Sequence, residues 1–282
     1  MDLEKQMKEK INIINKALEE TLSPLDAYPP IIHQAMHYSV FSGGKRLRPL
    51  LLIASYEMFN SNISNCLSLA CALEFIHTYS LIHDDLPAMD NDDYRRGKPT
   101  CHKVFGEGIA ILTGDALLNF AFEIILKDVR NNPHHIEAAI TIAEASGING
   151  MIGGQVMDLL YENKKIDAQT LEYIHSHKTA ALICAAVKAG AMAAGASCEY
   201  VKAIEEYGNA LGMAFQINDD ILDVNEGRKE ETKATYPALY GIQGALEAVK
   251  EYTFKAVNSL AIFGQKSRFL KDLAIYMMER DK

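Results

Sequence analysis

Two clusters of aspartates are the residues best suited to chemistry. The first lies in LIHDDLPAMDNDDYRRG (81–97), where five aspartates occur within ten residues directly after an apolar segment. Carboxylates this close together disfavour one another's ionisation, so such a dense cluster usually has a cation to neutralise it. The alternative is a solvated acidic loop. We expect a bound cation.

The second cluster consists of Asp219, Asp220 and Asp223 in the apolar context AFQINDDILDV (214–224), which fits a solvated loop poorly. On a helix, Asp219 and Asp223 differ by about 40° in direction, so both carboxylates point the same way. This spacing predicts that the two aspartates hold one hard cation together.

The first cluster needs a turn to bring its aspartates together. Asp84 and Asp90 are six residues apart, which would separate them by about 120° on an ideal helix. Pro87 should break the helix near Leu86 and let Asp90 fold back towards Asp84. Oxygen ligands supplied in ones and twos are typical of Mg²⁺. Zinc is disfavoured because His77 and His83 would lie on different helix faces, with no cysteine nearby to complete a zinc site.

Basic residues that would suit an anionic substrate accompany both clusters. GGKRLRP (43–49) is a glycine turn with three cations and then a proline, so its basic groups and backbone N–H groups should converge on one anion. A merely solvated basic turn is the alternative. Arg95 and Arg96 follow the first cluster, and Lys178 and Thr179 open an apolar helix. Arginine side chains match phosphate geometry.

The sequence carries no nucleophile motif. It lacks GxSxG, HExxH, GxxxxGK[ST] and a GxGxxG that follows a strand, which argues against hydrolase, zinc protease, P-loop and Rossmann readings. Gly153 and Gly154 precede Gln155 and Asp158 but follow no predicted strand. We assign the glycines to close helix packing, with Gln155 and Asp158 lining the site as a weaker option.

The elements that position these residues are predicted to be helices. No segment shows sustained period-two alternation, and prolines fall between long periodic segments, so we predict a single all-α domain (1–282) of about ten helices. The helices are placed at approximately 2–22, 30–41, 49–59, 64–86, 107–129, 133–145, 147–161, 168–195, 199–224, 236–262 and 266–280.

Composition narrows the class of protein. The formal net charge of -9 argues against a nucleic-acid binder, which needs a basic face. The five cysteines form no CxxC pair and the start MDLEKQMKEK lacks a signal-peptide pattern, so a cytoplasmic protein with reduced thiols is expected. The apolar tract 179–196 is interrupted by Lys188 and glycines, which predicts a buried helix and no membrane span.

Five motifs resemble those of the trans-prenyl diphosphate synthases, most closely the bacterial farnesyl diphosphate synthases, in order and approximate spacing. They are GGKRLRP (43–49), HDDLPAMDNDDYRRG (83–97), HKT (177–179), GMAFQINDDILD (212–223) and KATYPAL (233–239). The resemblance covers nearly the whole chain, and the two aspartate motifs with the RRG tail are highly specific together.

The resemblance implies a fold and a set of site residues. The fold would be a helical bundle around a deep central cavity, usually a homodimer, with the two acidic motifs on opposing helices. The magnesium ions, three with the allylic diphosphate bound, are expected on Asp84, Asp85, Asp90, Asp219 and Asp223. The allylic diphosphate is expected on Arg95, Lys178, Thr179, Gln216 and Lys233, and isopentenyl diphosphate on Lys45, Arg48, His77 and Arg96. The expected catalytic residues are Asp84, Asp85, Asp90, Arg95, Lys178 and Asp219.

The implied reaction joins dimethylallyl diphosphate, and then geranyl diphosphate, to isopentenyl diphosphate in the trans configuration. Farnesyl diphosphate is the expected product. Tyr79, with the small Ser80 beside it, lies about 7.5 Å along the helix from Asp84 and is expected to limit product length. The alternatives are a geranylgeranyl diphosphate synthase, a terpene cyclase or head-to-head synthase, and a non-catalytic subunit of a heteromeric synthase.

One segment departs from the family pattern. Only residues 224–232 separate Asp223 from Lys233, whereas the family usually has a longer loop with a further lysine and aspartate. We expect Arg228 or Lys229 to supply the missing cation.

Overall fold

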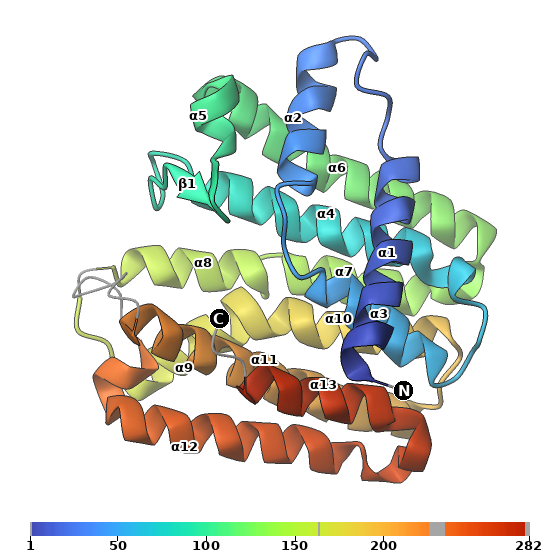
Figure 1. Cartoon of the computed structure of the whole chain (residues 1–282), viewed down its shortest axis with the longest axis vertical. Coiled ribbons are helices and arrows are strands. Elements are labelled where there is room, and N and C mark those ends of the chain that lie inside the picture. The colour runs from blue at the N-terminus through green and yellow to red at the C-terminus, as the bar shows by residue number, and fades with distance from the viewer. Residues whose placement is uncertain (1, 163, 226–234, 280–282) are drawn as a thin grey trace. The chain divides into compact units, whose positions relative to one another are not determined.

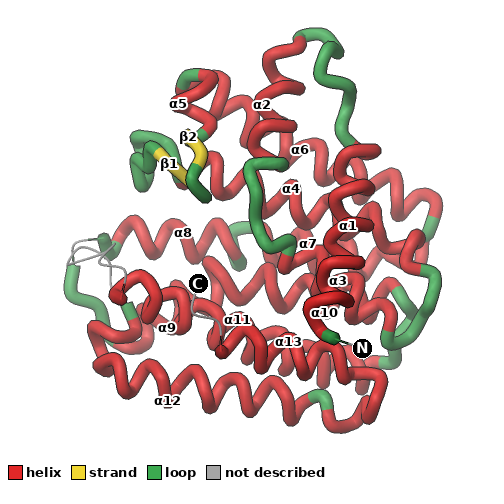
Figure 2. The backbone as a smooth tube through the Cα atoms, viewed as in Figure 1, coloured by secondary structure: helices red, strands yellow, loops and turns green. Residues whose placement is uncertain are grey.

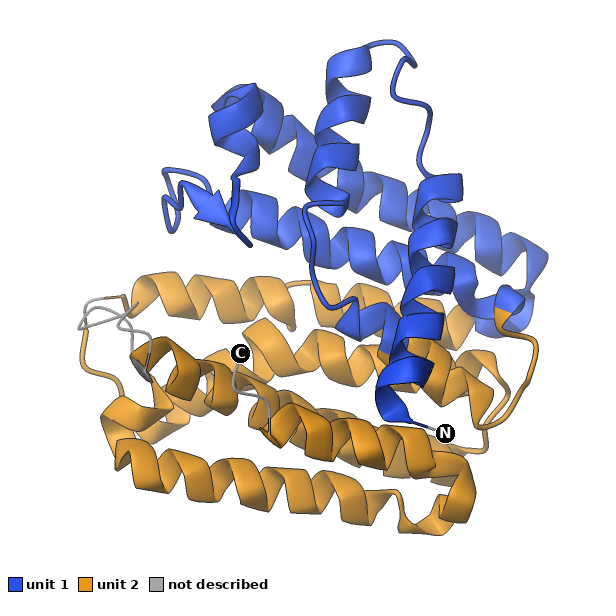
Figure 3. Ribbon diagram, in the orientation of Figure 1, with its two compact units in different colours: residues 1–50, 64–135 blue, residues 51–63, 136–282 orange. Residues whose placement is uncertain are grey.

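The structure is a computed structural model and describes residues 2–162, 164–225 and 235–279. Its described regular secondary structure is helical apart from one ribbon of two short strands (Figures 1 and 2). The prediction of an all-α protein is therefore confirmed. The chain divides into two compact units, residues 1–50 with 64–135 and residues 51–63 with 136–282 (Figure 3). The predicted single domain and its central cavity stay predictions.

Unit 1 holds the first acidic cluster and the glycine turn. Its elements are α1 (Leu3–Thr21), α2 (Pro30–Val40), the start of α3 (Leu47–Glu57), most of η1 (Ile63–Cys66), α4 (Leu67–Asp84), β1 (Tyr94–Arg95), β2 (Lys98–Pro99), α5 (Cys101–Phe105), α6 (Glu107–Asn131) and η2 (Pro133–His135). Helix α4 packs against α1, α2 and α6. It is apolar on nearly all sides, which is typical of a helix buried in a core. This core helix carries Asp84 at its last position.

Unit 2 holds the second acidic cluster. Its elements are the rest of α3, α7 (Ile136–Ser146), α8 (Met151–Leu160), α9 (Ala168–Ile174), η3 (His175–Ala180), α10 (Ala181–Ala193), α11 (Cys198–Asn225), α12 (Tyr236–Ser259), η4 (Ala261–Ser267) and α13 (Arg268–Glu279). Helix α11 packs against α10 on one side and α12 on the other. Ile217 and Ile221 of α11 are buried with Ala245 and Val249 of α12, which fixes the face of α11 that carries the aspartates.

Most predicted helices occur at the expected places, but the helix predicted at 168–195 is divided. The structure has α9, then the π-helical turn η3, and only then α10. A π turn adds one residue to a helical turn and is found mainly at functional sites. Here the turn contains Lys178 and Thr179, two of the residues singled out from the sequence.

Two described helices are long and apolar enough to cross a membrane by length and composition alone, Ile63–Asp84 and Glu107–Asn131. The apolar window of the first is 67% buried, as expected of a core helix, whereas the window of the second is only 39% buried. Helix α6 therefore exposes apolar side chains, among them Ile111, Leu112 and Leu126. The tract 179–196, predicted to be a buried helix and no membrane span, contains α10, which is largely buried.

Candidate active site

The first acidic cluster forms the turn expected from Pro87. Helix α4 ends at Asp84, and the backbone N–H of Asp90 donates a hydrogen bond to the carbonyl oxygen of Asp84 over 2.9 Å. The N–H groups of Met89 and Asn91 both bond to the carbonyl of Leu86. The chain therefore folds back and returns Asp90 to the end of the helix, as predicted.

A two-stranded ribbon then positions the paired arginines. Strand β1 pairs antiparallel with β2, and the connecting residues Arg96 and Gly97 both have positive φ angles, 54° and 76°. This is the pattern of a type I′ hairpin turn, which is usually signalled by Asn-Gly or Asp-Gly. Its strands are two residues long and its turn is Arg-Gly, so sequence patterns did not reveal it. Arg95 and Arg96 consequently reach different partners.

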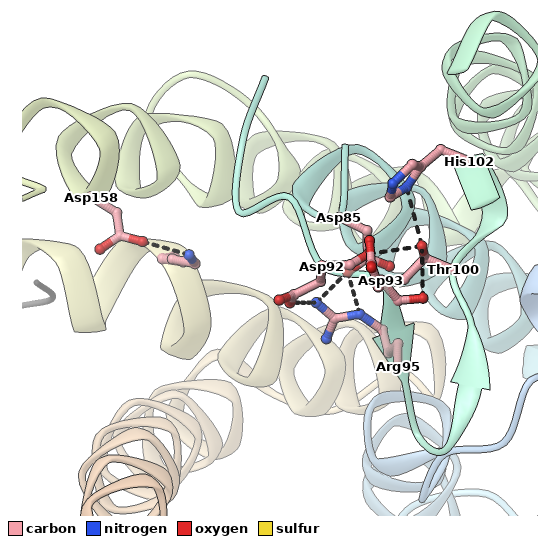
Figure 4. A network of polar contacts seen from close by, with 8 residues as sticks. Asp85, Asp92, Asp93, Arg95, Thr100, His102 and Asp158 are labelled. Carbon is pink, nitrogen blue, oxygen red and sulfur yellow. Dashed lines mark hydrogen bonds and ion pairs between the residues drawn. The ribbon is translucent and has the colours of Figure 1, made fainter. Parts of the chain in front are cut away.

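Arg95 binds the first acidic cluster (Figure 4). Its Nε and Nη2 lie 2.7 and 2.6 Å from Oδ1 of the buried Asp85, and its Nη2 lies 3.6 Å from Asp92 Oδ2. Burial raises the pKa of the Asp85 carboxyl, and the hydrogen bond from Arg95 opposes that rise. The guanidinium therefore stabilises Asp85 in its charged form.

Arg96 packs on the glycine turn instead. Its Nη1 donates to the carbonyl oxygen of Gly43 over 2.5 Å. Gly44 has a φ of 114°, and a Cβ atom added there would lie 2.4 Å from the same Nη1. Only glycine suits this position, because its backbone lies in the left-handed region and the guanidinium occupies the space of a side chain. The turn and the ribbon thus form one basic site within unit 1.

The structure corrects one part of the basic-turn prediction. Arg46 does not join Lys45 and Arg48 in a shared anion site, because its side chain is 5% exposed and turned into the unit. Its Nη1 lies 2.7 Å from Glu74 Oε1, and its other nitrogens donate to Asn15 Oδ1 and the carbonyl of Val40. Arg46 therefore holds the turn against α1 and α4. The segment KRLR (45–48) does not indicate that the Arg46 side chain points into the unit.

His77 lies on α4 near this basic site. Burial lowers its pKa well below the usual value, and the positive charges of Arg48 and Arg96 lower it further. The imidazole is therefore neutral at physiological pH. A neutral histidine among arginines can donate one N–H to a phosphate oxygen without adding charge.

In unit 2, Lys178 is paired with an acidic residue. Its Nζ lies 2.6 Å from Asp158 Oδ2 (Figure 4). A Cβ atom added to Gly154 would lie 2.1 Å from the backbone nitrogen of Lys178, so the glycine lets α8 approach η3 closely. The packing role predicted for Gly154 is thus confirmed. The sequence also suggests that Asp158 lines the site, and its contact with Lys178, a predicted site residue, supports that suggestion.

Gly154→Ala should destabilise the protein by about 1–3 kcal/mol, because the new methyl group would push against the backbone of Lys178. The free energy of unfolding from urea titration would measure this loss. Gly108→Ala is a matched control, since a Cβ atom added near the start of α6 meets no heavy atom within 4 Å. Equal stability of the two variants would contradict the close approach of α8 and η3.

The second acidic cluster lies near the end of α11, as predicted. Asp219 and Asp223 are partly exposed, whereas Asp220 is 6% exposed. Asp220 Oδ1 accepts a hydrogen bond from Gln216 Nε2 over 3.0 Å, and Gln216 Oε1 accepts one from Thr179 Oγ1 over 2.5 Å. Gln216 and Thr179, both predicted from the sequence, are therefore joined to each other and to the buried member of the cluster.

Tyr79 and Ser80 lie in the C-terminal third of α4. Tyr79 is 5% exposed, its hydroxyl has no hydrogen-bond partner among the described residues, and burial raises its pKa to about 12. Its ring lies edge-on to His83 at 5.8 Å. Ser80 donates to the carbonyl oxygen of His77. Tyr79 is therefore a neutral, buried aromatic side chain.

The donors present fit magnesium. Within the described ranges, no three His, Cys, Asp or Glu side chains lie close enough to hold a metal by themselves. Mg²⁺, however, generally takes one or two carboxylates and completes its shell with water and substrate phosphates. The aspartates of the two clusters offer oxygen ligands of this kind. Lys233, Arg228 and Lys229 lie outside the described residues.

Comparison with known proteins places these motifs in a family. A model of polyprenyl synthetase matches residues 29–254. The farnesyl diphosphate synthase of Escherichia coli is 41% identical over the full length of both chains. That alignment runs over 300 positions, more than the 282 residues here, so the relative carries residues that have no counterpart in this chain.

Other relatives differ in the product that they are named for. The chloroplastic geranylgeranyl pyrophosphate synthase of Capsicum annuum is 42% identical over 97% of this chain and 77% of its own. The apo structure of an FPP/GFPP synthase from Zymomonas mobilis has a TM-score of 0.90 at 37% identity, with 98% of each chain covered. The chain therefore belongs to the polyprenyl synthetase family and is a prenyltransferase of the isoprenoid synthase fold.

Proposed function

We propose that this chain is a magnesium-dependent farnesyl diphosphate synthase. It would condense dimethylallyl diphosphate with isopentenyl diphosphate, and then the resulting geranyl diphosphate with a second isopentenyl diphosphate. The observation that carries the proposal is that two neighbouring arginines contact different groups. Arg95 binds Asp85 in the acidic cluster, whereas Arg96 binds the carbonyl oxygen of Gly43 in the basic turn. An enzyme that binds two diphosphates requires two such positively charged places.

The allylic diphosphate would bind to Arg95, Lys178, Thr179, Gln216 and Lys233. Lys178 is held by Asp158 in this structure, so its ammonium would exchange that carboxylate for the substrate. Asp84, Asp85, Asp90, Asp219 and Asp223 would hold magnesium, which when bound neutralises the charge that develops on the departing diphosphate.

Isopentenyl diphosphate would bind at the basic turn of unit 1. Lys45, Arg48 and Arg96 supply the positive charge, and neutral His77 supplies a further hydrogen bond. Departure of the allylic diphosphate leaves a carbocation, which the double bond of isopentenyl diphosphate attacks to form the new carbon–carbon bond. Loss of a proton, with the released diphosphate as the base, then completes the product. No protein nucleophile takes part.

Farnesyl diphosphate is favoured as the product because a buried aromatic side chain, Tyr79, precedes Asp84 by five residues. The test is incubation of the purified chain alone with magnesium, dimethylallyl diphosphate and isopentenyl diphosphate, followed by mass spectrometry of the products. A fifteen-carbon product is expected. A twenty-carbon product would favour the geranylgeranyl alternative, for which named relatives exist. Turnover only after addition of another chain would favour a non-catalytic subunit.

We also propose a cytoplasmic homodimer. On α7, on α8 and in the turn between them, exposed apolar side chains occur, 39–77% exposed, at Ile136, Ile140, Ile148, Ile152, Val156 and Leu160. Exposed apolar side chains gathered on neighbouring segments are typical of a protein–protein interface. Light scattering of the purified protein should give twice the 31.3 kDa mass of one chain.

A further inference from the structure

Asp220 is a buried carboxylate that binds three separate parts of unit 2. Its Oδ1 accepts from the side chain of Gln216. Its Oδ2 lies 3.2 Å from Nε2 of His175 and accepts from the backbone N–H of Tyr236 over 2.9 Å. Both oxygens thus face protein donors, and the Asp220 side chain is buried, whereas Asp219 and Asp223 are partly exposed.

The ring of His175 turns its Nε2 atom towards this carboxylate. A carboxylate only accepts hydrogen bonds, so we expect the ring nitrogen that faces it to carry a hydrogen. The ring is 4% exposed, and Nδ1 is buried without a hydrogen-bond partner among the described residues. The contact between Nε2 and Asp220 Oδ2 is therefore the polar contact that this buried ring makes.

Two of the three donors lie on η3 and α11, the elements that carry Lys178, Thr179 and Gln216, and the third lies on α12. His175 opens η3, three residues before Lys178 and four before Thr179. Gln216 lies on α11, and its amide oxygen holds the hydroxyl of Thr179. Tyr236 opens α12. The packing is tight, because a Cβ atom added to Gly212 of α11 would lie 2.4 Å from the Cβ atom of Ala180 in η3.

We propose that Asp220 and His175 are positioning residues, which hold Lys178, Thr179 and Gln216 in the arrangement that binds the allylic diphosphate. Asp220 contributes its negative charge to the protein donors and not to a magnesium ion. The turn that carries Lys178 and Thr179 is a π turn, a rare backbone arrangement found mainly at functional sites. This inference rests on the proposed function of those three residues.

The test compares Asp220→Asn, His175→Leu and His175→Gln with the wild type. In Asp220→Asn, one amide oxygen must face three donors that a carboxylate faced before. In His175→Leu, one of those donors is removed. In both variants kcat/KM for geranyl diphosphate should fall by about 10- to 100-fold. KM for isopentenyl diphosphate should stay unchanged, because the basic turn of unit 1 is not in the network. Glutamine at position 175 can place an N–H near the position of Nε2 and should restore most of the loss.

His135→Leu is the matched control. His135 and Asp128 form a second buried histidine–aspartate pair, 2.7 Å apart, which ties α6 to η2 and contacts none of the proposed site residues. This variant should lower the thermal midpoint as His175→Leu does, with wild-type kinetic constants. If Asp220→Asn and His175→Leu also lose only stability, or if glutamine restores nothing, the positioning role is wrong.

A measurement without substrate or metal separates this inference from the proposed function. Nitrogen-15 spectra of labelled histidine should show His175 with a protonated Nε2, and that signal should move in Asp220→Asn. An Nε2 atom without a hydrogen would overturn the inference even in an active enzyme. A chain with the expected spectrum and no prenyltransfer would instead overturn the proposed function, and with it the purpose assigned to the network.

Discussion

Turnover of the Asp84→Ala and Asp219→Ala variants should fall by at least about 10³-fold, which corresponds to roughly 4 kcal/mol of lost transition-state stabilisation. Each substitution removes a carboxylate proposed to hold magnesium where charge develops on the departing diphosphate. No other group near the clusters offers a route around this loss, since the sequence has no nucleophile with its base. Excess chelator should have the same effect on the wild type, and added magnesium should reverse it.

Asp93→Ala is a suitable control from the same cluster. Its carboxylate lies 2.8 Å from the Nζ atom of Lys103, and both side chains are about half exposed, so little stability or activity should be lost. Circular dichroism should show unchanged helical content in all three variants. Activity of Asp84→Ala close to that of Asp93→Ala, or turnover that persists in chelator, would contradict the proposed role of the aspartates.

Tyr79→Ala should lengthen the product and destabilise the protein. Removing a 5% exposed ring from the core helix α4 should cost about 3–5 kcal/mol of unfolding free energy. The space left near Asp84 should admit one more isoprene unit, so that the twenty-carbon product replaces part of the fifteen-carbon product. Mass spectrometry of the products and urea denaturation measure the two effects separately.

Tyr79→Phe separates ring volume from the hydroxyl. The hydroxyl is buried without a hydrogen-bond partner in the described part of the chain, so its removal should leave stability equal or slightly higher. Product length should not change, because the ring remains. If the folded, active Tyr79→Ala variant gives an unchanged product distribution, Tyr79 is a core residue that does not limit product length. Other side chains would then limit it.

The fold and the acidic clusters could be predicted because they depend on local sequence. Helical periodicity placed Asp219 and Asp223 on one face of α11, and Pro87 implied the turn that the bond between Asp90 and Asp84 closes. Both features follow from backbone rules that apply within a few residues. The family motifs then supplied the residues expected on each diphosphate.

Features that depend on contacts between distant segments could not be predicted. Arg46 looked like one cation among three, but its direction is decided by Glu74 and Asn15, which lie 28 and 31 residues away. His175 lay just before a recognised motif, yet nothing in the sequence indicated that it reaches Asp220. The π turn was also missed, because helical periodicity does not record a single extra residue.

Helix α4 joins the proposed metal ligand Asp84 to the aromatic residue Tyr79 by one uninterrupted backbone. In the proposed role of Tyr79, the separation between the reacting end of a substrate and the residue that limits its tail is therefore set by helical hydrogen bonds and not by a loop. Inserting one residue between Tyr79 and Asp84 would add only about 1.5 Å but would rotate Tyr79 by about 100°, away from its present direction. In such an enzyme, substitutions that change the volume of the side chain at position 79 can change product length. Insertions and deletions between residues 79 and 84 cannot, because they would turn that side chain to another face of the helix.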